Sequence, residues 1–119
     1  MQKKIIITIV YWLLVAAFVI PGYLFGFQKL FAEPRKLADF TRWGYSTASM
    51  RFLGLGEIAA LTSLLFTATR YACFIFFCII LAGAIYTHTK NNDGKKQMMT
   101  PIIVWAHMAV IFILSNFIN

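Results

Sequence analysis

The chain has 119 residues, of which 61% are hydrophobic, 17% aromatic and only 13% charged. These charged side chains are too few to cover a water-soluble protein of this length, so a cytosolic enzyme is excluded, and the chain forms one domain at most. Two cysteines, seven glycines and three prolines exclude a disulfide scaffold and a collagen-like repeat. The mean hydropathy of +0.75 predicts an integral membrane protein.

Eleven Lys and Arg residues against four Asp and Glu residues give a formal charge of +7. The basic residues lie between apolar runs and not along one helical face. This arrangement is typical of segments that contact anionic lipid head groups. We therefore expect a lipid bilayer, and not nucleic acid, to be the partner of these charges.

The first apolar run, residues 5–27, contains no charged side chain. As a helix it would be about 34 Å long, which is enough to cross a bilayer. The run is long for a signal peptide, so we interpret it as a membrane anchor and not as a cleaved leader.

Residues 34–44 predict a short amphipathic helix at the membrane interface. Pro34 suits a first helical position and Gly44 suits a helix end. Trp43 and Tyr45 follow at the expected level of the lipid head groups.

Three further apolar segments predict membrane spans at residues 51–69, 71–88 and 101–118. Arg70 lies in the expected hairpin between the first two, residues 90–96 form a polar turn, and Pro101 opens the last span. The expected fold is all-α, an integral membrane four-helix up-down-up-down bundle with the interfacial helix between spans one and two. Residues 1–119 would form a single transmembrane domain.

The basic residues predict an orientation for this multi-pass protein in the cell (inner or plasma) membrane. Lys3, Lys4 and Arg70 lie on the side of the termini, and Lys3 and Lys4 favour keeping that side inside. The first and third connections are richer in basic residues and favour the reverse, with both termini outside. They carry Lys29, Arg35, Lys36, Arg42, Arg51, Lys90, Lys95 and Lys96.

Glu57 is the only acidic residue within a predicted span. A carboxylate in hydrocarbon costs at least a few kcal/mol unless it is paired, protonated or hydrated. Gly54 and Ala60 are small and share its helical face, so another helix can approach closely there. We expect Glu57 to pair with Lys29 first and Arg51 second.

Other ionisable side chains are expected in the same leaflet as this pair. The predicted intramembrane polar cluster consists of Glu57, Lys29, Arg51, Tyr86, His88 and His107. It is either an ion pair that specifies the fold or a functional polar site. His88 is equally explained as an interfacial residue, and His107 as a satisfied core histidine.

No catalytic motif is present, and no close pair of ligands in the sequence supports a metal site. Cys73 and Cys78 are five positions apart, about 140° around one helix, so they neither bridge nor form a redox pair. We interpret both as buried packing residues.

Four short motifs occur in a recognisable order: Gly26–Leu30, Phe40–Tyr45, Gly54–Glu57 and Tyr86–His88. In order and spacing they resemble the DoxX-like family of small four-span membrane proteins. The resemblance maps the family's lysine and glutamate onto Lys29 and Glu57, and its histidine onto His88. It carries no redox centre, and His107 inherits nothing from it.

The resemblance implies several different functions. One branch includes a subunit associated with thiosulfate:quinone oxidoreduction, others belong to oxidative-stress membrane complexes, and an animal branch is a chaperone for nicotinic acetylcholine receptor assembly. Our leading hypothesis is a non-catalytic accessory or assembly (chaperone-like) factor without a cofactor, which docks on a membrane-protein partner or forms a homo-oligomer. The alternatives are a quinone-associated redox subunit and a small-solute or proton path. The leading hypothesis predicts a filled bundle, whereas both alternatives require a cavity that reaches Glu57.

Overall fold

The computed structural model describes residues 2–118, apart from the side chains of residues 95 and 96. Within this range the chain is all-helical and contains no strand, as the sequence predicts. The five helices are α1 (Gln2–Leu30), α2 (Pro34–Arg42), α3 (Thr47–Leu64), α4 (Arg70–Lys90) and α5 (Lys95–Ile118).

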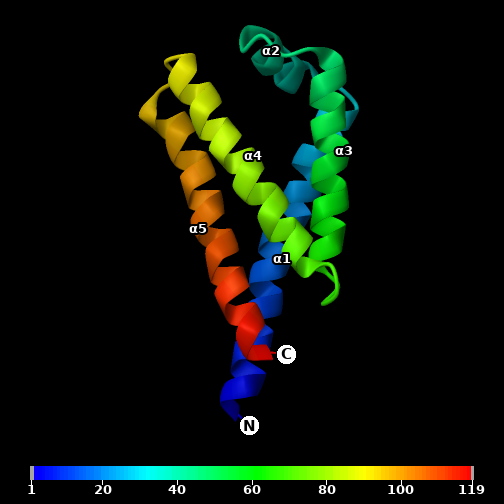
Figure 1. Cartoon of the computed structure of the whole chain (residues 1–119), viewed down its shortest axis with the longest axis vertical. Coiled ribbons are helices and arrows are strands. Elements are labelled where there is room, and N and C mark those ends of the chain that lie inside the picture. Colours follow the sequence, from blue (N-terminus) through cyan, green and yellow to red (C-terminus); the bar gives the residue numbers. More distant parts are fainter. Residues whose placement is uncertain (1, 119) are drawn as a thin grey trace.

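The four long helices form two pairs that diverge toward one end of the molecule. α1 rises from the lower end in Figure 1, α3 descends, α4 rises and α5 descends, so both ends of the chain lie low in this view. α1 packs on α3, α4 packs on α5, and the pairs meet through α1 with α5 and α3 with α4. α2 lies at the upper end, where the two pairs are farthest apart.

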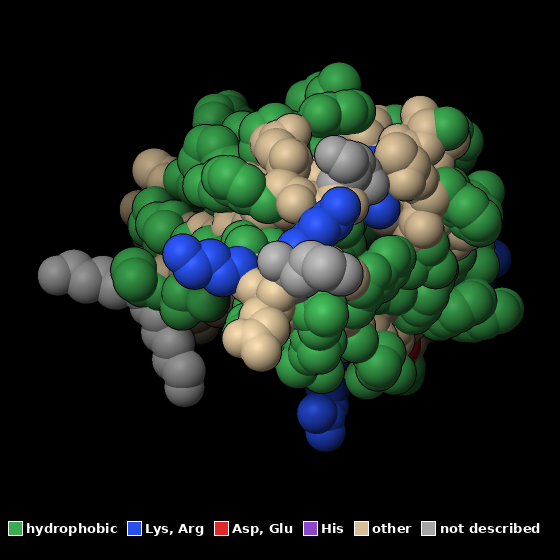
Figure 2. All heavy atoms as spheres, turned by 90° about the horizontal axis from the view of Figure 1, so that it is seen from below, with side chains coloured by type: hydrophobic (Ala, Val, Ile, Leu, Met, Phe, Trp, Pro, Cys, Tyr) green, Lys and Arg blue, Asp and Glu red, His purple; other side chains and the backbone are tan. Residues whose placement is uncertain are grey.

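Three helices are long and apolar enough to cross a membrane: α1, α4 and residues Gln97–Ile118 of α5. Only 22–28% of the apolar 18-residue stretch in each of these helices is buried inside the protein. Such apolar, outward-facing helices require a lipid environment. Hydrophobic side chains form most of the molecule's outline when it is viewed from the lower end (Figure 2).

The second predicted span is placed differently from the expectation. The segment expected at residues 51–69 is instead α3, which begins at Thr47 and ends at Leu64, and it is not among the candidate spans. It begins early because the Ser46 side chain accepts a hydrogen bond from the backbone N–H of Ser49, 3.1 Å away. With 18 residues that include Arg51 and Glu57, α3 is shorter and more polar than the three candidate spans.

The turn between α3 and α4 consists of residues 65–69, and Arg70 is the first residue of α4. Arg70 was expected in the turn itself, but its side chain is buried. Its Nε donates to the Leu64 carbonyl at 3.3 Å, and its guanidinium lies over the Tyr11 ring, 5.1 Å from the centroid. A cation at this position complements the partial negative charge at the C-terminus of α3.

The remaining helices match their predicted segments more closely. α1 and α4 extend residues 5–27 and 71–88 by a few positions at each end. α2 has Pro34 at its first position and is followed by Gly44 with φ +89°, as the turn chemistry predicts. α5 begins at Lys95, so Pro101 lies inside the helix and not in its first turn. It is tolerated there at the loss of one backbone hydrogen bond.

α1 and α3 approach each other so closely that their backbones touch. A Cβ atom on Gly54 would lie 2.5 Å from the Gly26 carbonyl oxygen and 2.8 Å from the Leu30 nitrogen, so only glycine fits there. The face of Gly54, Glu57 and Ala60 is buried, which confirms the close approach predicted from its small residues. This contact places the end of α1 beside the middle of α3.

Candidate functional site

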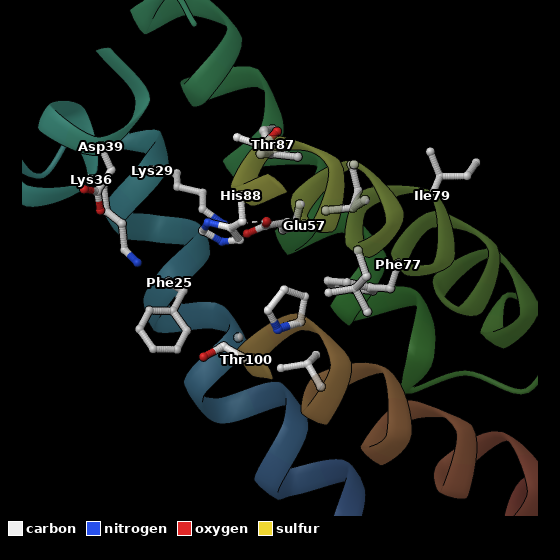
Figure 3. A pocket seen from close by; sticks show the side chains of 18 of the residues that line it. Phe25, Lys29, Lys36, Asp39, Glu57, Phe77, Ile79, Thr87, His88 and Thr100 are labelled. Atoms are coloured by element: carbon white, nitrogen blue, oxygen red, sulfur yellow. Dashed lines mark hydrogen bonds and ion pairs between the residues drawn. The ribbon is translucent and has the colours of Figure 1, made fainter. Parts of the chain in front are cut away.

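A cavity of about 680 Å³ lies between the two helix pairs and below α2. Residues of all five helices line it. Its apolar wall includes Phe18, Leu61, Phe77, Leu81 and Val104. Polar side chains gather toward α2, where Figure 3 shows Lys29, Lys36, Asp39, Glu57 and His88. The cavity is therefore amphipathic.

Glu57 and Lys29 form an ion pair on the cavity wall. Lys29 Nζ donates to Glu57 Oε1 at 2.6 Å, and the two side chains are 17% and 7% exposed. The backbone contact at Gly54 brings Lys29 within reach, since Lys29 Cβ lies 2.9 Å from where a Gly54 Cβ would be. The pairing that the sequence predicts first is confirmed.

Two of the predicted cluster residues lie elsewhere. Arg51 is exposed and forms no ion pair with any described residue. It is six positions from Glu57, which turns it about 120° away around the helix. Tyr86 is 64% exposed and does not line the cavity. It lies two positions from His88, about 160° around α4.

The two histidines line the cavity but serve different contacts. His107 Nε2 lies 2.9 Å from the Leu14 carbonyl oxygen, and its ring meets the edge of Phe18 at 5.5 Å. These contacts fit the interpretation of a satisfied core histidine. His88 Nδ1 lies 2.6 Å from Oδ2 of Asp93. Among the described residues, no His, Cys, Asp and Glu side chains form a group of three that could hold a metal ion.

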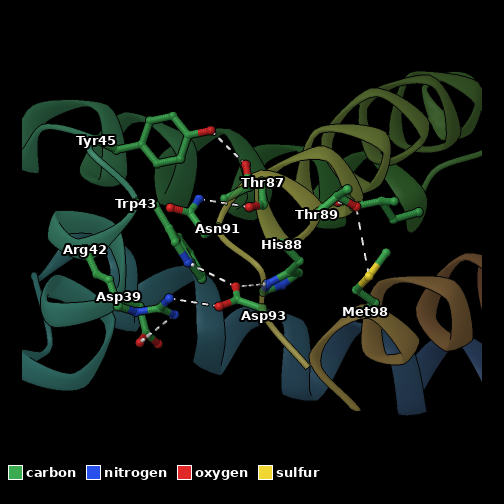
Figure 4. A network of polar contacts seen from close by, with 11 residues as sticks. Asp39, Arg42, Trp43, Tyr45, Thr87, His88, Thr89, Asn91, Asp93 and Met98 are labelled. Atoms are coloured by element: carbon green, nitrogen blue, oxygen red, sulfur yellow. Dashed lines mark hydrogen bonds and ion pairs between the residues drawn. The ribbon is translucent and has the colours of Figure 1, made fainter. Parts of the chain in front are cut away.

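Asp93 joins α2 to the far helix pair through a network that the sequence analysis missed (Figure 4). It accepts from Arg42 Nη1 at 2.8 Å and from Trp43 Nε1 at 3.2 Å, besides its contact with His88. The Trp43 ring also meets His88 edge-on at 5.3 Å. We call Arg42, Trp43, His88 and Asp93 the latch.

Trp43 and His88 of the latch also line the cavity. Nearby, the Tyr45 hydroxyl lies 2.7 Å from Thr87 Oγ1 and adds a second link between the two helix pairs. Asp93 belongs to a polar turn that predicted only solvent exposure. Two of its three partners, Arg42 and Trp43, are about 50 positions away in the sequence. No local pattern could have identified it, although Trp43 beside a basic residue marks the interface.

The two cysteines differ in their surroundings. Cys73 is buried in the core, as predicted, whereas Cys78 is exposed. The packing interpretation is therefore wrong for Cys78. Its position on α4, about 140° from Cys73, turns it away from the core.

The network around Asp93 predicts a pH dependence. Hydrogen bonds from His88 first, and then from Arg42, lower the pKa of the Asp93 carboxyl below its usual value. A carboxyl with a lowered native pKa stabilises the fold fully above its ordinary pKa of about 3.9, and this contribution is lost as the pH falls through the lower native value.

The latch should thus hold from neutral pH down past the ordinary pKa of about 3.9, and it should open only in stronger acid, where the pH falls through the lowered pKa of Asp93. Trp43 emission in a variant with Trp12→Phe and Trp105→Phe should shift to the red only in acid, whereas Asp93→Asn should shift it at every pH. Asp39→Asn is the control, because the Asp39 carboxylate contacts Arg42 at 3.9 Å, whereas Asp39 meets Trp43 through its backbone carbonyl, which the substitution keeps. If Asp93→Asn has the same Trp43 emission maximum as its parent at pH 7, Asp93 does not hold Trp43 and the latch is wrong.

The Lys29–Glu57 pair predicts a double-mutant cycle. Glu57→Gln or Lys29→Met alone should destabilise the protein by about 3–5 kcal/mol, because each leaves one buried group without its partner. The double variant should recover part of this loss. The free energy of unfolding in detergent would be measured for the two single variants and the double variant. Equal stability of the wild type and all three variants would show that the pair contributes nothing to stability.

Comparison with known proteins is consistent with this architecture. The profile of the DoxX-like family matches residues 9–112, which is most of the chain and includes Lys29, Glu57 and His88. No match was found among curated proteins or among solved structures. The family match over this length agrees with the resemblance seen in the sequence motifs, and the chain belongs to the DoxX-like family.

Proposed function

We propose that this protein is a multi-pass membrane protein that binds an amphipathic small molecule in the cavity between its helix pairs. The cavity itself supports the proposal. Its volume of about 680 Å³ lies within the range of about 300–1,000 Å³ that is usual for small-molecule sites. An apolar wall with polar groups at one end suits a ligand that has an apolar body and one polar end.

The bilayer is the proposed source of this ligand. A smaller hollow between α3 and α4 is lined by Phe52, Gly56 and Phe76, and it shares Ser49, Leu53 and Ile80 with the cavity wall. Phe52 on this side is 78% exposed. The shared lining gives a lipid-dissolved molecule a lateral route to the cavity between these two helices.

A quinone is one class that the residues would fit. Aromatic rings, among them Phe18, Phe25 and Phe77, line the cavity, and Lys36 or His88 could donate a hydrogen bond to a carbonyl oxygen. When bound, a quinone would supply two-electron redox chemistry to a partner subunit. Glu57 is held by Lys29 at 2.6 Å, so it would handle a proton only after that pair separates.

The other hypotheses from the sequence are less well supported. An accessory or assembly factor was expected to have a filled bundle, and the cavity argues against that expectation. Such a factor would dock a membrane-protein partner or a second copy on outward apolar faces, which lipid also covers. A proton or solute path needs polar groups along its length, whereas one wall of the cavity is apolar.

We further propose that α3 also crosses the bilayer, giving the four-helix up-down-up-down bundle with α2 at the interface. α3 packs backbone to backbone against the apolar α1. Its 18 residues make a helix about 27 Å long, close to the thickness of the hydrocarbon core. The basic residues near α2 favour a cytoplasmic position for that end, with both termini outside the plasma membrane.

Filling the cavity should prevent binding. Ala84 lines the cavity, whereas Ala82 on the same helix is exposed and does not. Ala84→Phe should weaken binding about tenfold or more, because the displaced ligand loses buried apolar contact. Ala82→Phe should leave binding unchanged.

Radiolabelled hexadecanoic acid, hexadecanol and a quinone with a ten-carbon tail are suitable probes, measured on the protein in lipid nanodiscs against empty nanodiscs. Saturable binding of at least one probe is expected. If none binds, or if Ala84→Phe and Ala82→Phe act alike, the proposed function is wrong.

The orientation can be tested with single cysteines in a variant that lacks Cys73 and Cys78. An impermeant thiol reagent added outside should label Gln2→Cys and Thr67→Cys but not Asn92→Cys. Labelling of Asn92→Cys alone would reverse the orientation. Labelling of Gln2→Cys and Thr67→Cys from opposite sides would show that α3 does not cross.

A further inference from the structure

Among the described residues, one cation at the polar end of the cavity has no ion pair with a carboxylate. Lys29 is paired with Glu57 at 2.6 Å, and Arg42 faces Asp93 at 2.8 Å and Asp39 at 3.9 Å. Lys36 differs from both: its Nζ has no ion pair with a described carboxylate. Its charge is the one that the protein's own acidic groups leave without a direct partner at the cavity.

Lys36 extends from α2 into the cavity in Figure 3. Its Nζ lies 4.8 Å from the centroid of the Phe25 ring, on α1. An aromatic face attracts a cation but carries no net negative charge. The ring therefore orients the ammonium group without neutralising it.

The surroundings of Lys36 disfavour its charged form. Burial lowers its pKa below the usual value, and the nearby charge of Lys29 lowers it further, although Asp39, Glu57 and Glu33 act in the opposite direction. An anion bound beside Nζ would offset both of the unfavourable effects. The cavity thus offers an anion a charged donor that is already partly removed from water.

Resting on the proposed function, we propose that the ligand of this cavity is an acidic amphiphile. A carboxylate or phosphate head group pairs with Lys36 beneath α2, and an apolar tail lies against Phe18, Leu61 and Phe77. The apolar wall selects the tail and the ammonium group selects the head. Lys36 is then the residue that determines specificity for charge.

Ligands with one tail and different head groups test this proposal. Binding of hexadecanoic acid, hexadecyl phosphate, hexadecanol and hexadecylamine would be measured in neutral-lipid nanodiscs at pH 8.0. The two acids should bind about tenfold more tightly than the alcohol, the scale of one hydrogen bond to a charged group. The amine should bind more weakly than the alcohol.

Variants of two neighbouring cations assign this preference to one residue. Lys36→Gln should remove the preference for the acids, while saturable binding of hexadecanol shows that the variant is folded. Lys36→Arg should keep the preference. Arg35→Gln is the matched control, because Arg35 is exposed on the same helix and does not line the cavity. It should behave like the wild type.

The possible failures are distinct. If the alcohol binds as tightly as the acids, the acidic class is wrong. If Lys36→Gln and Arg35→Gln act alike, the assignment to Lys36 is wrong. In either case the proposed function stands. Competition by millimolar inorganic phosphate would show that the site reads a head group alone, which overturns the amphiphile. If no probe with a tail binds, the proposed function fails together with this inference.

Discussion

A carboxylate inside an apolar bundle must have a cation beside it, and much of this structure depends on that constraint. Glu57 would be costly to bury in hydrocarbon without a partner. Lys29 reaches it because Gly26 and Gly54 let the backbones of α1 and α3 touch. A side chain at Gly54 would separate the helices and lengthen the ion pair. The small residues and the ion pair therefore make α1 and α3 one structural unit.

The cavity follows from how this unit meets the second pair, α4 and α5. The two pairs pack together through the lower part of the bundle and diverge toward α2. Helices that diverge leave a space that their side chains do not fill, and here the space reaches the ion pair. At the upper end α2 packs on α1 and α3, and side chains of the latch join it to the end of α4 and the turn that follows.

Membership of the DoxX-like family and the geometry contribute different information. The family match, with three apolar helices, establishes a membrane protein. The geometry adds an amphipathic cavity whose polar end holds one engaged ion pair and one lysine without a direct ionic partner. In the proposed function this combination suits binding better than a continuous polar path, because Lys36 is available to a ligand's head group, whereas Glu57 could transfer a proton only after its ion pair with Lys29 separates.

Several features of this protein could be predicted from its sequence because they depend on local physics. The uncharged runs in α1, in α4 and in most of α5 require a lipid environment. Pro34 and Gly44 mark the two ends of a short helix. A single acidic residue beside small residues predicts a nearby cation. The position of each residue along a helix follows from the rise per residue, so Lys29 and Glu57 could be placed at one depth.

Rotation about the helix axis and the angle between helix pairs depend on the packing of all the helices together. Tyr86, Arg51 and Cys78 were therefore assigned to the wrong surroundings, and the contact of Arg70 with the Leu64 carbonyl at the end of α3 was not predicted. Only the tertiary structure joined Asp93 to Arg42 and Trp43, and only the divergence of the two pairs produced the cavity, because neither contact between distant segments nor empty space leaves a periodic pattern in the chain.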